Sequence, residues 1–452
     1  MPSPVLSLPP DFRLVPSSGG LAIERGRFHL PLGLPLGEMG PELRAALERL
    51  ASGGATEEEL LGRVQGLELL RLHQLLADLA ERRLLCRTLQ RGGEPAITVV
   101  PFSRSAPEPR GSAPDRLVLS RFACLRREGS SWVAESPLAH SYLIVHGAGA
   151  PLLSRLAASL ERDGLEAEER GWIDLLWEEG FLAAPEEGED PDLASWEFHD
   201  LLFHARSRSG RHRNRYGGTY PFRGQIEPLP ALKAPMSGET VDLHRPDLER
   251  LIQEDLPFTR VLEERRSRRE PGERPVSARE LGEFLYRSSR VREVRTTATH
   301  EISDRPYPGG GALYELEIYP AVNRCEGLDA GLYHYDPRNH RLERLTGMTP
   351  ETRALTEAAG AMAEAPPPDV LLVLAARFRR VTWKYRSMAY AGILKNAGAL
   401  YQTMYLVAAA MGLSACALGG GDADLFARAA GTRWEAETSV GELILNRSSS
   451  PR

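Results

Sequence analysis

Residues 383–421 read WKYRSMAYAGILKNAGALYQTMYLVAAAMGLSACALGGG, a polar lead-in followed by a long apolar segment and a run of glycines. Between residues 388 and 411 apolar side chains recur with helical spacing and small residues fill the opposite flank, which predicts a helix buried on nearly all sides. Such a helix would span roughly 35 Å, yet Lys395, Asn396 and Gln402 interrupt it too often for a membrane span. The pattern indicates a core helix around which a domain is built.

The glycine run after this segment belongs to residues 417–422, ALGGGD. Without Cβ atoms the backbone N–H groups can approach a planar ligand or an anion closely. Three glycines after a helix are also typical of a helix C-cap and turn, so the run by itself leaves both interpretations open.

Composition limits the class of protein. The chain has 452 residues, 42% of them hydrophobic, and a net charge of −6, so we expect two to four domains and no general attraction to nucleic acid or anionic membrane. The N-terminus lacks a charged region followed by an apolar run, and we expect neither a signal peptide nor a membrane span. A cytoplasmic location is the resulting prediction.

The cysteines and histidines predict no metal site. Cys86, Cys124, Cys325 and Cys416 are far apart and none lies in a C-x-x-C pair, which argues against a zinc ribbon or a dithiol redox site. Lysine is also scarce, since the only three are Lys233, Lys384 and Lys395. A lysine at position 384 therefore requires a specific reason.

The first 186 residues contain two similar units, which we assign to residues 1–100 and 115–186. The first has strand-like pieces at 21–23 and 27–30 and helices at 41–51, 56–64 and 67–82, and the second has strands at 117–125 and 132–134 and helices at 150–162 and 166–179. Thr56 with Glu59 has the form of a capping box. Helices followed by a short β-turn-β element are typical of a winged helix-turn-helix, and its repetition predicts a duplicated module.

The last helices of these units carry acidic residues where DNA phosphates would require Arg or Lys: Asp78, Glu81, Asp174, Glu178 and Glu179. DNA binding is therefore disfavoured. A winged helix can instead offer its wing edge or a groove to an extended peptide. The alternative is that both units are scaffold or dimer contacts.

Residues 187–255 have low hydrophobicity and predict a linker. The segment 196–204 resembles a docking helix more than a metal site, because His199 and His204 are five residues apart and no acidic or cysteine cluster accompanies them. The basic run at 206–215 predicts a solvated arm, or a grip on an acidic leader peptide.

From residue 256 the sequence predicts an α+β domain. The run RRSRR at 265–269 combines forked guanidiniums and a hydroxyl suited to a phosphate. A proline and glycine loop, RPYPGGGALY at 305–314, leads into the alternating segment 314–322, in which Glu315 and Glu317 alternate with apolar residues. A hairpin partner follows at 331–336, and further strands are expected at 369–375 and 440–445, with the long helix packed on the sheet.

These motifs, in this order, resemble the nitroreductase-like flavoproteins, most closely their SagB/ThcOx-type azoline dehydrogenase branch. The similarity runs from Trp196 to the C-terminus, while the N-terminal pair of units resembles the peptide-clamp modules that precede the catalytic domain in cyanobactin oxidases. The resemblance implies FMN, a homodimer, and oxidation of thiazolines or oxazolines in a ribosomally made precursor peptide. A leader-bearing precursor peptide and a cyclodehydratase of the same pathway are the implied partners.

The resemblance also implies roles for particular residues. Lys384 and Tyr385 stand where the family has its proposed catalytic pair. The implied FMN-binding residues are Arg265, Arg266, Ser267 and Arg269 for the phosphate and ribityl chain, Pro308, Gly309, Gly310 and Gly311 beside the isoalloxazine, and Gly419 and Gly420 at its N5 edge. The chain departs from the family at Gly309 and Gly310, where Ser-Ala is usual, so a hydroxyl near the flavin is missing.

Two other functions remain open. The chain could be a nitro- or quinone reductase that uses NAD(P)H, although such an enzyme has no use for a duplicated recognition module and no nicotinamide fingerprint is visible. It could also be a catalytically idle peptide-binding subunit that retains flavin to complete its fold.

Overall fold

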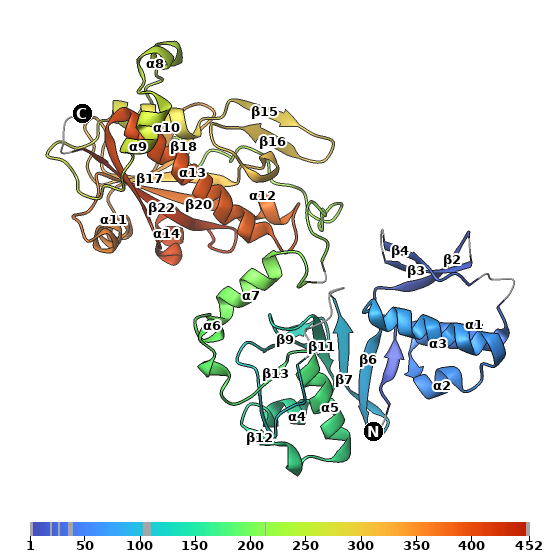
Figure 1. Ribbon diagram of the computed structural model, residues 1–452. Coiled ribbons are helices and arrows are strands. Elements are labelled where there is room, and N and C mark those ends of the chain that lie inside the picture. Colours follow the sequence, from blue (N-terminus) through green and yellow to red (C-terminus); the bar gives the residue numbers. More distant parts are fainter. Residues whose placement is uncertain are drawn as a thin grey trace. The chain divides into compact units, whose positions relative to one another are not determined.

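The computed structural model describes residues 3–18, 20–25, 28–34, 39–102, 110–212 and 214–448. The chain forms two compact units, Met1–Asn214 and Arg215–Arg452 (Figure 1). Within the described residues no helix has the length and apolar character needed to cross a membrane.

The first unit contains the same succession of elements twice. The order of strands in the sheet is also the same. In both repeats the opening strand lies in the middle, with the strand that follows the first helix on one side and the strand that follows the last helix on the other. The elements of the first repeat are β1 (Val5–Ser7), α1 (Pro41–Ser52), β5 (Ala55–Thr56), α2 (Glu57–Leu61), α3 (Gly66–Glu81) and β6 (Cys86–Arg91).

The second repeat replaces the short middle helix with a single 3-10 turn. Its elements are β8 (Arg116–Leu119), α4 (Ala150–Arg155), β12 (Leu160–Glu161), η2 (Arg162–Gly164), α5 (Ala167–Glu178) and β13 (Leu182–Ala183). The sheet orders β5-β1-β6 and β12-β8-β13 correspond strand for strand. This arrangement agrees with the predicted duplication.

The ends of the two long helices match in detail. Leu84 N–H donates to the carbonyl of Leu79 at 2.8 Å, and Phe181 N–H donates to that of Leu176 at 3.0 Å. The residues just before these donors, Arg83 and Gly180, both have positive φ, 55° and 82°. A left-handed residue that lets the following N–H reach back to a helix carbonyl is typical of a helix C-terminus, and both repeats use it.

Further strands extend the sheet of the first repeat, whereas β12, β8 and β13 of the second repeat form a sheet of their own. The further strands are β7 (Glu94–Pro101), β9 (Cys124–Glu128), β10 (Ser131–Glu135) and β11 (Ser141–Val145), and the full order is β5-β1-β6-β7-β11-β10-β9. The antiparallel pairing of β7 with β11 places Pro101 opposite Ser141. A separate sheet consists of β2 (Arg13–Ser17), β3 (Gly20–Arg25) and β4 (Phe28–Pro31).

Several predicted bounds in this unit were wrong. The helix expected at 150–162 ends at Arg155, because the following residues pair with β8 as β12. The strand expected at 117–125 is two strands, β8 and β9, that belong to different sheets. The capping box of Thr56 and Glu59 is confirmed, and Arg27, expected to begin a strand, lies outside the described residues.

Residues 187–255 contain regular structure. They include η3 (Glu187–Glu189), α6 (Pro191–Ala194), α7 (Phe198–Ser207), β14 (Thr240–Asp242) and α8 (Leu248–Glu254). Helix α7 lies where the docking helix was predicted. Strand β14 pairs with β19 at the edge of the second unit's sheet, so this part of the expected linker belongs to the sheet. Arg213, in the basic run, lies outside the described residues.

The second unit has α+β architecture, as predicted. Its main sheet is antiparallel, with the order β14-β19-β18-β17-β20-β22-β21. The other strands of this sheet are β17 (Leu316–Val322), β18 (Gly331–Asp336), β19 (Arg341–Thr346), β20 (Val370–Arg377), β21 (Leu413–Leu418) and β22 (Glu437–Arg447). A hairpin, β15 (Glu293–Thr296) and β16 (Glu301–Asp304), lies beside it.

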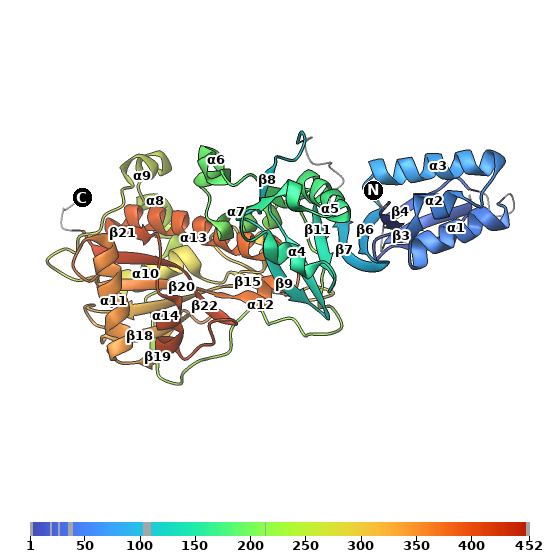
Figure 2. The same cartoon turned by 90° about the horizontal axis from the view of Figure 1, so that it is seen from below.

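Helices cover both faces of this sheet (Figure 2). Leu316 and Ile318 pack on one face with α10 (Ala278–Ser289) and α13 (Ala389–Met411), whereas Tyr319 and Ala321 pack on the other with α11 (Pro350–Ala363) and α14 (Ala423–Ala430). The remaining helices are α9 (Phe258–Glu264) and α12 (Phe378–Thr382), with a short 3-10 turn η4 (Gly310–Ala312).

The predicted long helix is confirmed as α13, but its end differs from the prediction. Gly412 caps it in the left-handed conformation with φ 72°. Residues 413–418 then form β21. The glycine run therefore follows a strand and not the helix.

The alternating segment forms the predicted strand as β17, but Glu315 and Glu317 do not mark a side that faces solvent. Both side chains are buried, with 0% and 2% of their surface exposed. Strand β17 is covered on both faces, so its polar residues point into the protein and not into solvent.

Candidate functional site

Lys384 lies between α12 and α13 and points toward the glycine loop. Its Nζ donates a hydrogen bond of 3.5 Å to the backbone carbonyl of Gly311. Burial, and then the charge of Arg380, lower the pKa of Lys384 below its ordinary value. A larger fraction of this amine is therefore neutral near pH 7 than for a lysine in water.

The loop at 308–311 folds tightly against Lys384 and Tyr385. Gly311 has φ 65°, and a Cβ atom there would collide with the hydroxyl of Tyr385 and the Nζ of Lys384. The next residues are strained, because Ala312 and Tyr314 also have positive φ, 56° and 46°. The structure thus brings together the predicted catalytic pair and the predicted Gly309–Gly311 loop.

Arg380, from α12, fixes the far side of this loop. Its side chain is 3% exposed and donates to the carbonyl of Leu313 through Nε at 3.2 Å and Nη2 at 2.7 Å. It also donates to the carbonyls of Leu229 and Glu301. Burial and the charges of Arg377 and Arg305 lower the pKa of Arg380 to about 10, so it remains a cation at neutral pH.

A segment that the sequence analysis assigned to the linker holds the backbone of Lys384. The N–H groups of Thr219 and Tyr220 both donate to the carbonyl of Lys384 at 3.0 Å, and Gly218 pairs with Tyr385. Further along, Trp383 Nε1 donates to the carbonyl of Ile226 at 2.6 Å. We call residues 218–239 the strap.

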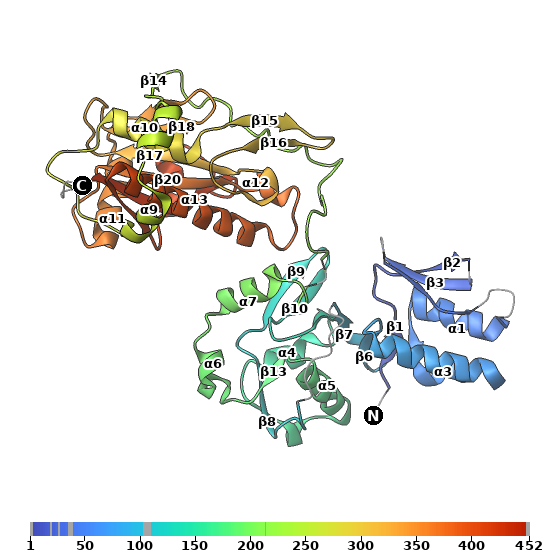
Figure 3. The same cartoon turned by 45° about the horizontal axis from the view of Figure 1, so that its top comes forward.

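Figure 3 shows the hairpin of β15 and β16. His300, in the turn between these two strands, joins the same neighbourhood. Its ring lies 5.9 Å from that of Trp383 and 6.1 Å from that of Tyr220. Nδ1 lies 2.8 Å from the Thr299 hydroxyl, and Nε2 is buried without a partner among the described residues. Burial, then Lys384 and Arg380, lower the pKa of His300. Sequence reasoning missed this residue, since a lone histidine in a turn gives no local signal.

The arginine run 265–269 forms a second group, next to the C-terminal half of α13. The guanidinium of Arg265 lies 5.2 Å from the ring centre of Tyr405, and the Tyr405 hydroxyl lies 3.1 Å from the hydroxyl of Ser267. Tyr405 also accepts a hydrogen bond of 2.7 Å from the N–H of Ala417. Tyr405 is a further residue that sequence reasoning missed, because it resembled one more core aromatic of the helix.

A cavity of about 200 Å³ opens beside this group, lined among others by Arg260, Arg266, Arg268, Tyr405 and Ser448. Within the part of the chain that the structure describes, Arg265, Arg266, Arg268 and Arg269 form no ion pair with a carboxylate. The carbonyl of Arg269 is held by Asn446 at 2.8 Å. Glu264, which also lines the cavity, pairs with Arg260 at 2.6 Å, so these four guanidiniums are left without a paired carboxylate among the described residues.

Gly419 and Gly420 form a third group. They follow β21, and Gly420 lines a cavity of about 640 Å³ with Leu355 and Met362 of α11. No contact between described residues joins these glycines to Lys384 or to the loop at 308–311. The structure does not bring this part of the predicted set together with the rest.

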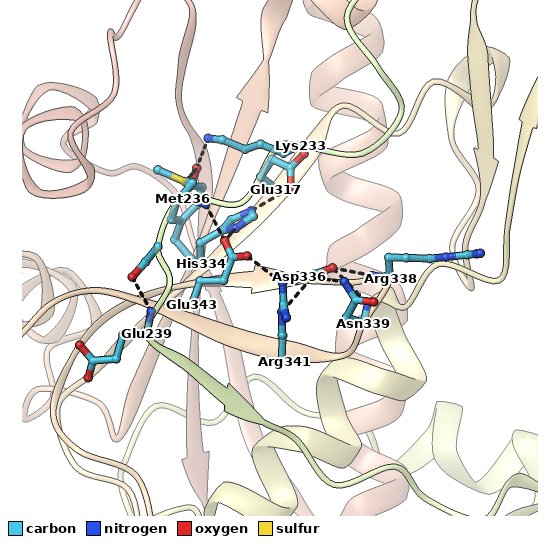
Figure 4. Close-up of polar contacts among 12 residues, drawn as sticks. Lys233, Met236, Glu239, Glu317, His334, Asp336, Arg338, Asn339, Arg341 and Glu343 are labelled. Carbon is cyan, nitrogen blue, oxygen red and sulfur yellow. Dashed lines mark hydrogen bonds and ion pairs between the residues drawn. The ribbon is translucent and has the colours of Figure 1, made fainter.

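A buried ionic cluster holds the strap to the other face of the sheet (Figure 4). His334 lies between Glu317 and Glu343, 3.1 and 3.0 Å from their carboxylates. Burial alone would lower the pKa of His334 and raise that of Glu317. The hydrogen bonds that His334 makes with the two carboxylates outweigh burial, so the pKa of His334 is raised and that of Glu317 is lowered to about 2. Met236 N–H, in the strap, donates to Glu343 at 2.9 Å, and Lys233 pairs with Glu437 at 2.6 Å.

Among the described residues of either unit, no group of three His, Cys, Asp or Glu side chains is arranged so that it could hold a metal ion. The site therefore consists of cations, glycine backbone and aromatic rings. Its polar groups suit an anionic, planar ligand more than a metal ion.

Comparisons with known proteins place the second unit in a family. The model of the nitroreductase family matches residues 262–443. The protein named "Putative nitroreductase MJ1384" from Methanocaldococcus jannaschii is 31% identical over 186 residues, which cover 40% of this chain and 85% of that protein. The chain belongs to the nitroreductase family. This family assignment makes the chain an oxidoreductase with the predicted fold.

This nitroreductase-family chain also matches a second family model and two proteins named for the processing of other molecules. The model of the cyanobactin oxidase ThcOx matches residues 117–213. The trifolitoxin-processing protein TfxB of Rhizobium leguminosarum is 29% identical over 28% of this chain and 35% of its own length. The microcin B17-processing protein McbC of Escherichia coli is 33% identical over 24% of this chain and 42% of its own length. The chain thus spans less than half of these two relatives.

Proposed function

We propose that the chain is an FMN-dependent dehydrogenase that oxidises thiazolines or oxazolines of a ribosomally made precursor peptide to thiazoles or oxazoles. The observation that carries the proposal is the position of Lys384, a lysine of lowered pKa held against a strained glycine loop in a nitroreductase-family unit. The match to a cyanobactin oxidase and the names of TfxB and McbC support a peptide substrate.

The arginine segment fits a phosphate-bearing cofactor. Arg260 at the cavity of about 200 Å³ is paired with Glu264, but Arg265, Arg266, Arg268 and Arg269 have no carboxylate partner among the described residues, and the hydroxyls of Ser267 and Tyr405 lie beside Arg265. Charge-assisted bonds from Arg to phosphate are strong and directional. Arg265, Arg266, Ser267 and Arg269 would hold the FMN phosphate. FMN, when bound, supplies the acceptor for the hydride that leaves the azoline ring.

Lys384 is the proposed base for the proton that must leave the adjacent ring carbon. An amine acts as a base only when neutral, and burial beside Arg380 favours the neutral form. Tyr385 places its hydroxyl against the same loop and would orient the substrate or relay the proton. The roles of Gly419 and Gly420 at the flavin edge remain part of the proposal.

The first unit is the proposed binding site for the leader of the precursor peptide. A cavity of about 410 Å³ lies between α3 and the sheet, and its lining includes Leu76, Ala77, Ala80, Arg87 and Pro101. A groove beside a helix with both apolar and charged walls suits an extended peptide. A homodimer is also proposed, supported by Tyr390 and Leu394 on α13, which are 47% and 38% exposed. A cyclodehydratase of the same pathway would supply the azolines.

The decisive experiment is mass spectrometry of a leader-bearing peptide that contains thiazolines, incubated with the FMN-loaded protein. Each oxidised ring lowers the peptide mass by two hydrogen atoms. The match to MJ1384 favours a second candidate, reduction of nitro compounds or quinones with NAD(P)H. If the peptide mass stays unchanged while NADH is consumed with a quinone, the reductase is the correct function. If neither reaction occurs with flavin bound, the chain is an idle subunit.

A further inference from the structure

Asn396 connects the glycine loop to a buried acid. Its Oδ1 accepts a hydrogen bond of 3.0 Å from the N–H of Gly310, and its Nδ2 donates one of 2.9 Å to Oε1 of Glu315. Asn396 is 8% exposed and Glu315 is fully buried. The side chains form a relay from strand β17 through helix α13 to the loop that faces Lys384.

Each bond in this relay fixes the next group. An asparagine amide can rotate and exchange its oxygen and nitrogen. Because Glu315 Oε1 accepts from Nδ2, the amide oxygen is left for Gly310. The N–H of Gly310 is thereby turned toward α13. The carbonyl of the next residue, Gly311, accepts the hydrogen bond from Nζ of Lys384.

The loop needs such support because its backbone is strained. Ala312 and Tyr314 have positive φ, which is strained for residues other than glycine, and strained residues of this kind persist only where the surroundings hold them. Arg380 holds Leu313 on one side, and Tyr314 donates from its hydroxyl to the carbonyl of Tyr307 at 2.9 Å. Gly310 has Asn396 as its partner, so the relay secures the end of the loop nearest α13.

We propose that Glu315 and Asn396 are positioning residues that set the place of the Gly309–Gly311 loop against Lys384. They act through the loop and do not contact the substrate. The inference rests on the proposed function for its catalytic consequence, but the loop geometry itself does not depend on which reaction occurs. Burial raises the pKa of Glu315, and its second oxygen has no partner among the described residues, which agrees with an uncharged acid in the relay.

The test compares Asn396→Leu and Glu315→Leu with Gln402→Leu. Gln402 lies on the same helix and is exposed, so its substitution controls for changes to α13 alone. Glu315→Gln is the conservative variant, because the Gln carbonyl can still accept from Asn396 Nδ2. Each full-length protein is loaded with FMN, and its absorbance spectrum and melting temperature are recorded to identify variants that fail to fold.

The first measurement is amide hydrogen exchange of the segment 305–316 of the protein, in the absence of the substrate. We expect faster exchange in Asn396→Leu, a smaller increase in Glu315→Leu, and wild-type exchange in Glu315→Gln and Gln402→Leu. The second is turnover of the thiazoline peptide, where we expect kcat to fall at least ~10-fold in Asn396→Leu with the peptide KM within about twofold of wild type. Glu315→Gln should restore most of the rate that Glu315→Leu loses.

Wild-type exchange and kcat in a folded Asn396→Leu protein would overturn the proposal. A uniform loss of stability with exchange raised throughout the unit, and no recovery in Glu315→Gln, would show a purely structural role and overturn it as well. If the wild-type protein oxidises no azoline, the proposed function fails, yet the exchange experiment still decides whether the relay holds the loop.

Discussion

Arg83 and Glu179 join the two repeats of the first unit: Nη2 of Arg83 donates to the Glu179 carboxylate at 2.8 Å. The carboxylate also accepts hydrogen bonds from Nη2 of Arg87 at 2.5 Å and from the hydroxyl of Ser141 at 2.7 Å. Glu179 is 1% exposed. A single buried acid therefore connects the end of one repeat to the end of the other.

Removal of this acid should destabilise the first unit. Glu179→Ala leaves two buried or half-buried cations without their partner, which typically costs about 3–5 kcal/mol. Glu178→Ala is the matched control, because Glu178 is adjacent and exposed. Urea unfolding followed by tryptophan fluorescence measures the difference. Equal unfolding midpoints for the two variants would contradict a stabilising role for the buried acid.

The same carboxylate should make stability depend on pH. Burial alone would raise the pKa of Glu179, but Arg83, Ser141 and Arg87 outweigh it, so the pKa lies below its ordinary value of 4.5. Because the pKa of Glu179 is lowered in the folded protein, the stabilisation that its carboxylate provides is fully present above about pH 4.5. This stabilisation is lost as pH falls through the folded-state pKa. Wild-type protein should therefore lose stability in this acidic range more steeply than Glu179→Gln. Parallel curves of melting temperature against pH would rule this out.

Lys384 should control the rate of oxidation and not the retention of cofactor. A general base typically contributes 10²–10⁴-fold, so we expect Lys384→Ala to lose roughly 100-fold or more in turnover, and Tyr385→Phe to lose less. Because the base form is neutral and the pKa of Lys384 is lowered, kcat should rise with pH and level off below the pH expected for an ordinary lysine. This rise should disappear in Lys384→Ala.

The control is the flavin absorbance of the same samples. Lys384→Ala protein that keeps its flavin and oxidises peptide at the wild-type rate would remove Lys384 from the role of base. A variant that is inactive because it has lost FMN would do the same.

Arg265 should contribute to FMN retention. A hydrogen bond to a charged group is worth about 1.5–3 kcal/mol, so Arg265→Ala should weaken FMN binding roughly 10- to 150-fold. Arg428→Ala, at an exposed position on α14, is the control. Fluorescence titration of the apoprotein with FMN gives both dissociation constants. Identical values would exclude the arginine segment as the phosphate site.

The cavity beside α3 should determine affinity for the leader. Ala77→Trp fills it with an indole ring, whereas Arg71→Trp adds the same ring to α3 at a residue that does not line it. We expect Ala77→Trp to weaken binding of a leader-bearing peptide about 10-fold or more, as for loss of a central contact in an interface. Turnover of a peptide that lacks the leader should stay unchanged. Equal binding by both variants would indicate that this unit is scaffold.

The sequence by itself determined the elements whose signals are local. The apolar period of residues 389–411 predicted α13 because a 3.6-residue repeat is a property of the segment alone. Thr56 predicted a helix start for the same reason, since its capping partner, Glu59, lies three residues away. The motifs at 265–269, 305–314 and 331–336, together with the long helix and its glycine run, likewise indicated the resemblance to the family before any contact was known.

Only the tertiary structure decided which of these motifs meet. The alternation at Glu315 and Glu317 predicted a strand, but the burial of both side chains follows from helices on both faces of β17. The strap reaches Lys384 across more than 160 residues of sequence, with Tyr220 donating to its carbonyl. His300 arrives on a separate hairpin. Contacts of this kind depend on the pairing of distant segments, which leaves no periodic or local trace in the amino-acid sequence.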